Sequence, residues 1–244
     1  YTHRIAQSRA SASSIRRMSG SSAWIFPGQG SQSVSMGAAT LAGSPAARAV
    51  MAEAEAALNE PLGRLIAEGP AEVLERTEQA QPAILAMSIA LLAAARERAA
   101  ATGETLPLPR YIAGHSAGQY AAAVAADALS IADGVRLARR RGELMQAAVP
   151  AGTGAMAAVL GMDDAALEAA CAEAKQGEVV EAVNFNAPSQ VVIAGHRTAV
   201  ERGAALVKTK GAKRAVLLPV SAPFHSSLLK PACAERSATF RSGI

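Results

Sequence analysis

Residues 111–126, YIAGHSAGQYAAAVAA, are patterned as a strand, a tight turn and a helix. The apolar run at 111–114 suits a short strand, and the alanine-rich run from about 117 to 126 favours a helix. Between them lies GHSAG, which matches G-x-S-x-G. In this context the pattern holds a serine in a strained backbone conformation, with its oxygen at a helix N-terminus. Ser116 is therefore the candidate nucleophile; the alternative is a plain tight turn.

The segments before and after this turn alternate in a similar way. Residues 23–26 are a short apolar run stopped by Pro27-Gly28, and helical patterns follow at about 46–58 and 82–101. A further helix begins after Ser130, a good N-cap residue, and ends before Pro150. Strands that alternate with helices predict a parallel α/β sheet.

The order of elements changes after Pro150. The expected elements are a strand, a helix, two strands, a helix and a strand, at residues 155–160, 163–175, 179–185, 190–194, 198–210 and 214–220. This β-α-β-β-α-β order is the ferredoxin-like unit. We therefore expect a small domain at 152–218, inserted into a larger α/β domain made of residues 23–151 and 219–244.

The net charge of +4 does not describe the folded part of the chain. Residues 1–22 carry four arginines and no acidic residue, which leaves 20 basic and 20 acidic residues in the remainder. Nucleic-acid binding needs basic residues gathered on the fold. With 3% aromatic residues, the chain also has few side chains on which bases could stack. No nucleic-acid partner is expected.

Residues 1–22 have the Arg- and Ser-rich, acid-free composition of an organellar transit peptide. The alternative is a start at Met18, just before the first strand, with an untranslated region upstream. We favour the second, which implies a cytoplasmic protein; the first would place it in a mitochondrion or plastid.

The chain is 50% hydrophobic, which allows one large domain with a small insertion. Its longest apolar stretch, 83–95, is shorter than the roughly 18 residues of a membrane span, so we expect a buried helix and no membrane partner. Cys171 and Cys233 are too few for a disulfide framework and show no metal-ligand spacing.

A serine hydroxyl is a weak nucleophile until a base takes its proton. Of the four histidines, His3 lies in the tail and His196 follows a strand end, where we expect solvent exposure. His115 precedes the nucleophile and is expected to support the turn. His225 comes directly after a strand, where a loop would end over the sheet. His225 is the candidate base; the alternative is a loop histidine bonded to the backbone.

Residues 26–32, FPGQGSQ, form a glycine-bracketed loop after the first strand. Glycines let backbone amides approach a ligand, and loops at the carboxyl ends of parallel strands build the site of an open α/β sheet. The loop lacks the lysine of a phosphate-binding P-loop, so nucleotide binding is disfavoured.

With three further stretches, these motifs resemble the malonyl-CoA:acyl-carrier-protein transacylases of type II fatty-acid synthesis. The matching stretches are FPGQGSQ at 26–32, GHSAG at 114–118, RGELMQAAVPAGTGAM at 141–156, NFNAPSQVVIAG at 184–195 and PVSAPFHSSLLKPA at 219–232. Their common order, over about 24–232, makes the resemblance specific. It implies an α/β-hydrolase-like domain with an inserted ferredoxin-like domain.

The resemblance also implies roles for the matching residues. Ser116 would carry the malonyl group, with His225 as its base and then acid. The backbone N–H groups of Gln29 and Ala117 would form the oxyanion hole. Arg141 would hold the malonyl carboxylate, because a planar guanidinium pairs a carboxylate through two hydrogen bonds. The alternative for Arg141 is a solvated helix face shared with its two arginine neighbours.

Phe224 and His115 would also belong to the substrate site. A bulky residue beside the base accompanies malonyl over methylmalonyl groups in related acyltransferases; the alternative for Phe224 is a core position. The implied substrate is malonyl-CoA, with no cofactor or metal, and the implied partner is acyl carrier protein. We expect a monomer.

The acidic carrier protein would dock on a basic patch of the enzyme. Two sets of residues could supply this patch: Lys208, Lys210, Lys213 and Arg214, or Arg136 and Arg140.

The sequence departs from the family's pattern in two respects. Ala117 is smaller than usual, and Gln119 stands where an acidic residue is common. The resemblance also fades near Cys233, although the family continues for several tens of residues, including a glutamine that orients the catalytic histidine. We therefore expect a C-terminally incomplete chain. The alternatives are a polyketide-type acyltransferase, a serine esterase with a triad acid, and an inactive truncated remnant.

Overall fold

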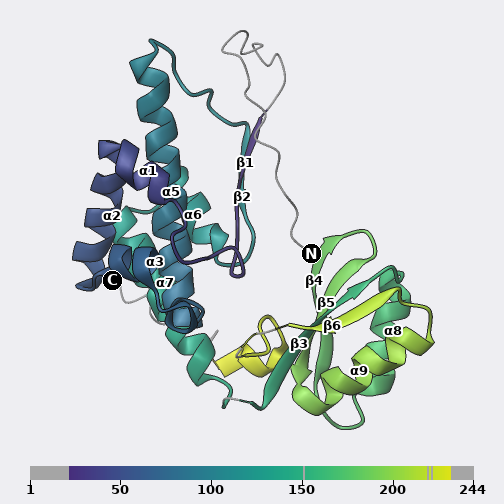
Figure 1. The fold of residues 1–244 in the computed structure, drawn as a ribbon. Helices are drawn as coiled ribbons and strands as arrows, with labels where there is room; N and C mark the ends of the chain where they lie inside the picture. Colours follow the sequence, from purple (N-terminus) through teal and green to yellow (C-terminus); the bar gives the residue numbers. More distant parts are fainter. Residues whose placement is uncertain (1–21, 151, 219, 221, 232–244) are drawn as a thin grey trace.

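The computed structural model describes residues 22–150, 152–218, 220 and 222–231. The predicted transit peptide or upstream region, up to residue 21, and Cys233 lie outside these residues. Figure 1 shows a group of helices beside two short, paired strands, and a separate sheet covered by two helices.

The two paired strands form a parallel sheet. Strands β1 (Ala23–Phe26) and β2 (Tyr111–Gly114) pair in register, with Ala23 opposite Tyr111 and Phe26 opposite Gly114. Five helices lie between them in the chain: α1 (Ala38–Gly43), α2 (Pro45–Leu58), α3 (Leu62–Glu68), α4 (Ala71–Leu74) and α5 (Thr77–Ala101). Helices α6 (Gly118–Ala125) and α7 (Ile131–Ala147) follow β2. The carboxyl ends of both strands therefore meet at one edge, where sites of α/β sheets form.

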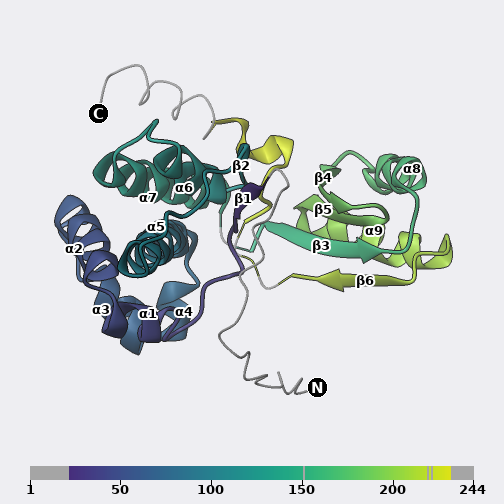
Figure 2. The same ribbon diagram turned by 90° about the horizontal axis from the view of Figure 1, so that it is seen from above.

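Helix α5 lies among α2, α6 and α7 (Figure 2). Its buried side chains are mostly aliphatic or alanine, which allows the neighbouring helices to pack closely. The helix begins five residues before Pro82, where the sequence predicted its start. Proline removes one backbone donor and is tolerated best in the first turn, so the prediction placed the boundary too late. This difference matters for the site, because residues 77–81 are helical.

The second sheet has four strands in the order β4-β5-β3-β6, and all neighbours are antiparallel. The chain order is β3 (Gly154–Leu160), α8 (Asp164–Ala174), β4 (Val180–Ala187), β5 (Gln190–His196), α9 (Arg197–Thr209) and β6 (Arg214–Leu217). Both helices pack on one face of this sheet. The predicted α/β fold class, with a parallel sheet and a β-α-β-β-α-β unit, is confirmed.

The opposite face of the antiparallel sheet meets the rest of the molecule. Met156, Val192 and Ala194 on this face form a buried cluster with the end of α7 and with residues 222–229. Residues 222–229 contain the short 3-10 helix η1 (Ser227–Leu229). The loop that carries His225 is therefore seated on the antiparallel sheet.

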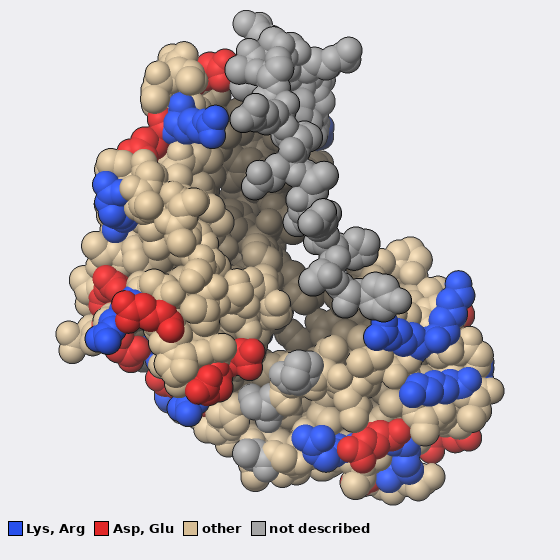
Figure 3. Space-filling model, in the orientation of Figure 1, with Lys and Arg blue, Asp and Glu red and all other residues tan. Residues whose placement is uncertain are grey.

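Charged side chains of both signs are scattered over the face of the molecule in Figure 3, most of which is uncharged. Basic side chains are the more numerous over the half that contains α8 and α9. Within the described residues, no helix is long and apolar enough to cross a membrane.

Candidate functional site

Ser116 lies at the tip of the turn between β2 and α6. Its backbone has φ of 50°, in the left-handed region that non-glycine residues rarely adopt. The side chain is therefore presented at the N-terminus of α6, where the helix dipole favours negative charge. This is the strand–turn–helix context that the pattern at 114–118 predicted.

Glycines allow this turn to close against the loop after β1. A Cβ on Gly114 would lie 2.1 Å from the backbone carbon of Gly118. A Cβ on Gly118 would lie 2.3 Å from the carbonyl oxygen of Phe26, and one on Gly28 would lie 2.6 Å from that of His115. The two loops thus touch backbone to backbone. This contact brings Gln29 next to the nucleophile turn.

His225 contacts the candidate nucleophile directly. Its Nε2 lies 2.8 Å from Ser116 Oγ, within hydrogen-bond distance. Like Ser116, His225 has a left-handed backbone, with φ of 66°. The neighbouring Ser226 donates its hydroxyl hydrogen to the Pro223 carbonyl at 2.7 Å, which closes the turn. A serine and a histidine at this distance have the geometry that a nucleophile and its general base require.

Arg141 is the third side chain at the nucleophile. It is 8% exposed, and its Nη2 donates to Ser116 Oγ at 3.1 Å. The position depends on Gly142, whose Cβ would lie 2.5 Å from Glu78 Cα, so α7 touches the start of α5. Arg141 therefore lies inside the molecule and beside Ser116, whereas Arg140 pairs with Glu143 near the surface.

A chain of side-chain hydrogen bonds leads from Arg141 to the loop after β1. Arg141 Nη1 donates to Gln81 Oε1 at 2.6 Å, and Gln81 Nε2 donates to Thr77 Oγ1 at 2.9 Å. The Thr77 hydroxyl donates to Gln29 Oε1 at 2.7 Å. Thr77 and Gln81 are both almost fully buried. Their bonds fix the guanidinium plane and the Gln29 loop relative to each other.

The backbone N–H groups of Gln29 and Ala117 belong to the two loops that touch here. Neither group has a hydrogen-bond acceptor among the residues that the structure describes. Ala117 is the N-cap residue of α6, and its small side chain is buried. These two donors can serve an oxyanion formed at a carbonyl carbon attacked by Ser116.

The surroundings of His225 favour its neutral form. Removal from water lowers the pKa of His225 below its ordinary value of 6.5, and the charges of Arg141 and then His115 lower it further. A neutral imidazole can accept the serine proton. By contrast, burial raises the pKa of the Cys171 thiol to about 11, so this thiol is protonated at neutral pH.

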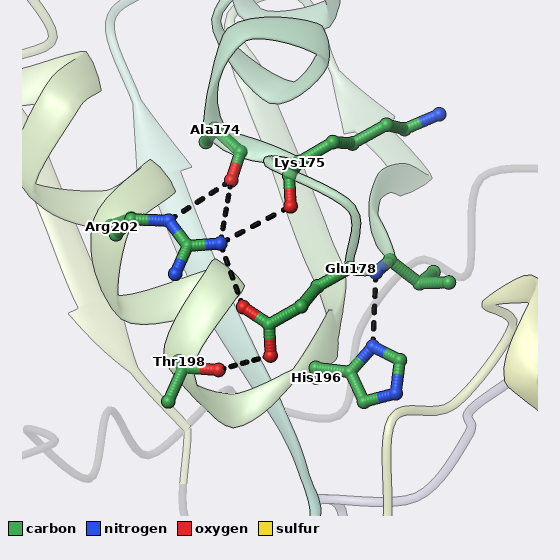
Figure 4. Close-up of polar contacts among 7 residues, drawn as sticks. Ala174, Lys175, Glu178, His196, Thr198 and Arg202 are labelled. Atoms are coloured by element: carbon green, nitrogen blue, oxygen red, sulfur yellow. Dashed lines mark hydrogen bonds and ion pairs between the residues drawn. The ribbon is translucent and has the colours of Figure 1, made fainter.

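The other predicted residues lie as follows. His115 Nε2 is 3.1 Å from Asn186 Oδ1 on β4, so its ring connects the nucleophile turn to the second sheet. Phe224 is buried in the apolar cluster beside the base. His196, expected to be exposed, is partly buried, and its Nδ1 accepts a hydrogen bond from the Val179 N–H at 2.9 Å (Figure 4). It caps the turn before β4 and lies away from the site.

Sequence reasoning missed Thr77, Gln81 and Asn186. The first two precede Pro82, where the predicted helix began, so nothing indicated that they faced inward. Asn186 lies within a motif that the resemblance quoted, but its side chain was given no role. Among the described residues, no group of three or more His, Cys, Asp or Glu side chains could hold a metal ion.

Comparison with known proteins agrees with this geometry. Residues 23–242 match the model of the acyl transferase domain family. The malonyl CoA-acyl carrier protein transacylase of Escherichia coli K12 is 51% identical over 210 residues, which are 86% of this chain and 66% of that protein. The Haemophilus influenzae protein of the same name is 47% identical over 220 residues, covering 90% of this chain and 69% of that protein.

A solved structure of a malonyl-transacylase in complex with its type II polyketide acyl-carrier protein is also similar. It has a TM-score of 0.86 and 42% identity, and the match covers 91% of this chain and 70% of that one. The match to the E. coli relative covers 66% of that protein's length, slightly less than two thirds. By its family model and these relatives, the chain belongs to the malonyl-CoA:acyl-carrier-protein transacylases of the acyl transferase domain family.

Proposed function

We propose that this protein transfers the malonyl group of malonyl-CoA to the phosphopantetheine thiol of acyl carrier protein, through a malonyl-serine intermediate, in fatty-acid synthesis. One observation carries the proposal: Ser116 Oγ contacts His225 Nε2 and a buried guanidinium, that of Arg141. A nucleophile and base suffice for any acyl transfer. The buried arginine additionally favours an acyl group that carries its own carboxylate, because a guanidinium pairs strongly with a carboxylate.

In the first half-reaction, Ser116 Oγ attacks the thioester carbon while its proton passes to His225 Nε2. The N–H groups of Gln29 and Ala117 receive the oxyanion, and each such donor is worth roughly 10²–10³ in rate. The C–S bond then breaks, and His225 returns the proton to the leaving CoA sulfur. The carrier's thiol takes the acyl group by the reverse steps, which gives ping-pong kinetics.

Arg141 is suited to hold the malonyl carboxylate during both steps. Gln81 fixes one terminal nitrogen of the guanidinium, while the other points at Ser116. Burial strengthens the pairing of the guanidinium with a carboxylate, because water competes less for the donors. A serine esterase has no comparable use for a cation at its nucleophile, so this arrangement favours the transferase over that alternative.

The proposed partner is supported by the relatives and by charge. Related proteins are named for malonyl-CoA and acyl carrier protein, and one was solved with a carrier bound. Lys208, Lys213 and Arg214 are exposed at the end of α9 and the start of β6, whereas Lys210 pairs with Glu173. A basic surface of this kind suits an acidic carrier.

The finer expectations belong to the same proposal. The domain bounds remain 23–151 with 219–244 for the large domain and 152–218 for the small one. The named relatives are bacterial, which supports a cytoplasmic location. The reaction steps use only side-chain and backbone groups, so we propose no cofactor.

Intact-mass measurement tests the proposal. Wild-type protein incubated with malonyl-CoA should gain one malonyl group, and Ser116→Ala should gain none. Adding carrier protein with its phosphopantetheine arm should remove the group from the enzyme and place it on the carrier, while carrier without the arm should not. If water removed the group as fast as the carrier does, the protein would be an esterase.

A further inference from the structure

The loop that carries His225 packs on the antiparallel sheet, whereas Ser116 follows a strand of the parallel sheet. Ala222, Phe224 and Leu229 pack against the face of the antiparallel sheet that α8 and α9 leave open. At the start of β3, a Cβ on Gly154 would lie 2.3 Å from Pro223 Cδ, so the backbone and the proline ring are in close contact. The base and the nucleophile therefore belong to different sheets.

One carboxylate on this sheet forms direct hydrogen bonds with the loop. Glu181 on β4 accepts a hydrogen bond from the Ser227 backbone N–H at 2.8 Å and another from the Ser227 hydroxyl at 2.9 Å. Ser227 is the first residue of η1 and lies two residues after His225. Hydrogen bonds to a carboxylate are stronger than neutral ones, and two of them fix position as well as distance.

The backbone of His225 requires such an anchor. A non-glycine residue with φ of 66° lies in a sparsely populated region, and it persists only where the surroundings determine it. On one side, Ser226 and Pro223 close the turn. On the other side, the anchor is the contact of Glu181 with Ser227.

The same strand also reaches the nucleophile turn. Asn186, near the end of β4, lies 3.1 Å from His115 Nε2, and His115 is the residue before Ser116. Alternation along a regular strand would place positions 181 and 186 on opposite faces. The register between β4 and β5 shifts twice, between Ala182 and Asn184 and again between Phe185 and Ala187, so alternation is interrupted on both sides of Asn184 and Asn186 can face the nucleophile turn.

We propose that β4 sets the alignment of the Ser116–His225 pair, with Glu181 as the positioning residue for His225 and Asn186 as a second contact to the nucleophile turn. This inference rests on the proposed function. Glu181 touches neither reacting group. It acts by holding the loop from which the imidazole reaches Ser116 Oγ.

The test uses Glu181→Ala and Glu181→Gln, with Glu178→Gln as the matched control. Glu178 lies just before β4, where it accepts from Thr198 and Arg202, away from His225 (Figure 4). Losing Glu178's contacts perturbs the same part of the sheet without touching the His225 loop. The measurements are melting temperature, KM for malonyl-CoA and the single-turnover rate of Ser116 acylation.

We expect Glu181→Ala to slow acylation by roughly 10²-fold, the effect of a displacement of about 1 Å at the reacting atoms. KM should change little, because Arg141 still holds the carboxylate. Glu181→Gln keeps an acceptor for one of the two donors and should lie between Glu181→Ala and wild type. Glu178→Gln should leave the rate at the wild-type value even where it lowers the melting temperature. Equal slowing in the Glu178 and Glu181 variants would overturn the proposal.

A second measurement is independent of malonyl transfer. NMR titration of the His225 ring in the resting protein should show its pKa rising towards the ordinary value in Glu181→Ala, as the ring leaves Arg141 and Ser116. An unchanged titration would also overturn the proposal. Failure of wild type to form a malonyl adduct would instead contradict the proposed function, and the titration would still decide the role of Glu181. If Glu181→Ala does not fold, Ser227→Ala removes one of the same two bonds.

Discussion

Ser116 Oγ lies 2.8 Å from His225 Nε2, although the two residues are 109 positions apart in the chain. Each has a left-handed backbone, and each is presented by a different sheet. The contact therefore exists only when the packing between the two sheets is in place. Local strain at both residues and long-range packing together produce this contact.

Replacing Arg141 should separate malonyl transfer from simple acyl transfer. Arg141→Ala removes the charged partner of the carboxylate, and one hydrogen bond to a charged group contributes about 1.5–3 kcal/mol, so even a single lost bond should lower kcat/KM for malonyl-CoA roughly 10- to 100-fold. Acetyl-CoA, without a carboxylate, should lose much less. Because Ser116 loses the same neighbour in both reactions, the ratio of the two kcat/KM values isolates the carboxylate contact. Arg140→Ala is the control and should leave the ratio unchanged. Equal losses for both substrates would contradict the role of Arg141.

The acylation rate should stay high to a lower pH than an ordinary histidine allows. Desolvation first, and then the charges of Arg141 and His115, lower the pKa of His225 below 6.5. The acid limb of the single-turnover rate should therefore have its midpoint below pH 6.5, and Arg141→Ala should move the midpoint upward. A wild-type midpoint above 6.5 would show that the base lies in different surroundings.

The same shift predicts how stability depends on pH. The unfolded chain binds a proton at His225 more readily than the folded chain does, so protonation favours unfolding. The neutral His225 ring therefore makes its full contribution to the free energy of unfolding above pH 6.5. This contribution is lost as pH falls from 6.5 towards the folded-state pKa of His225. Urea unfolding at several pH values should show this loss in wild type, and a smaller loss in His225→Gln. A free energy of unfolding that rises as pH falls below 6.5 would contradict the lowered pKa of His225.

Gly114→Ala should destabilise the fold and abolish acylation. The new Cβ would lie 2.1 Å from the Gly118 carbonyl carbon, so the turn must open. Overpacking of this kind costs about 1–3 kcal/mol, which for a chain of this size lowers the melting temperature by several degrees. Gly43→Ala is the control: its Cβ meets nothing within 4 Å, and it lies in α1, where alanine is the better helix former. Similar melting temperatures for the two variants would show that the turn is not tightly packed.

Phe224→Ala should shift selectivity towards branched acyl groups. Phe224 is 7% exposed and lies next to the base, where it would fill the space of an α-methyl group. One methyl-sized contact is worth about 1–3 kcal/mol, so the ratio of kcat/KM for methylmalonyl-CoA to that for malonyl-CoA should rise at least about tenfold. Met156→Ala opens a cavity in the same buried cluster and controls for general loosening. An equal change in both variants would assign Phe224 to the core alone.

Local signals in the sequence predicted several of the elements around the candidate catalytic pair. The strands at 23–26 and 111–114 have the predicted bounds, because glycine and proline end each apolar run. Ser130 caps α7 by accepting a hydrogen bond from the Asp133 N–H, as its position indicated. Asp163 likewise caps α8. Interactions between residues close together in the chain, such as these caps, can be predicted from the sequence alone.

The contacts that complete the site could not be predicted in the same way. Gln81 on α5 and Arg141 on α7 form a hydrogen bond although they are 60 positions apart in the chain. Glu181 and Ser227 form one across 46 positions. Both contacts depend on packing: Gly142 against α5 in the first case and the His225 loop against the antiparallel sheet in the second. Helices α1, α3 and α4 were also missed, because four to seven residues give little periodicity.

The residue that carries the acyl group can be identified by mass spectrometry. Wild-type protein should be mixed with malonyl-CoA, stopped with acid, digested and sequenced by mass spectrometry. We expect a malonyl ester on Ser116, absent in Ser116→Ala and slow to form in His225→Ala. A malonyl group on any other residue, or transfer to carrier protein by Ser116→Ala at the wild-type rate, would contradict this expectation.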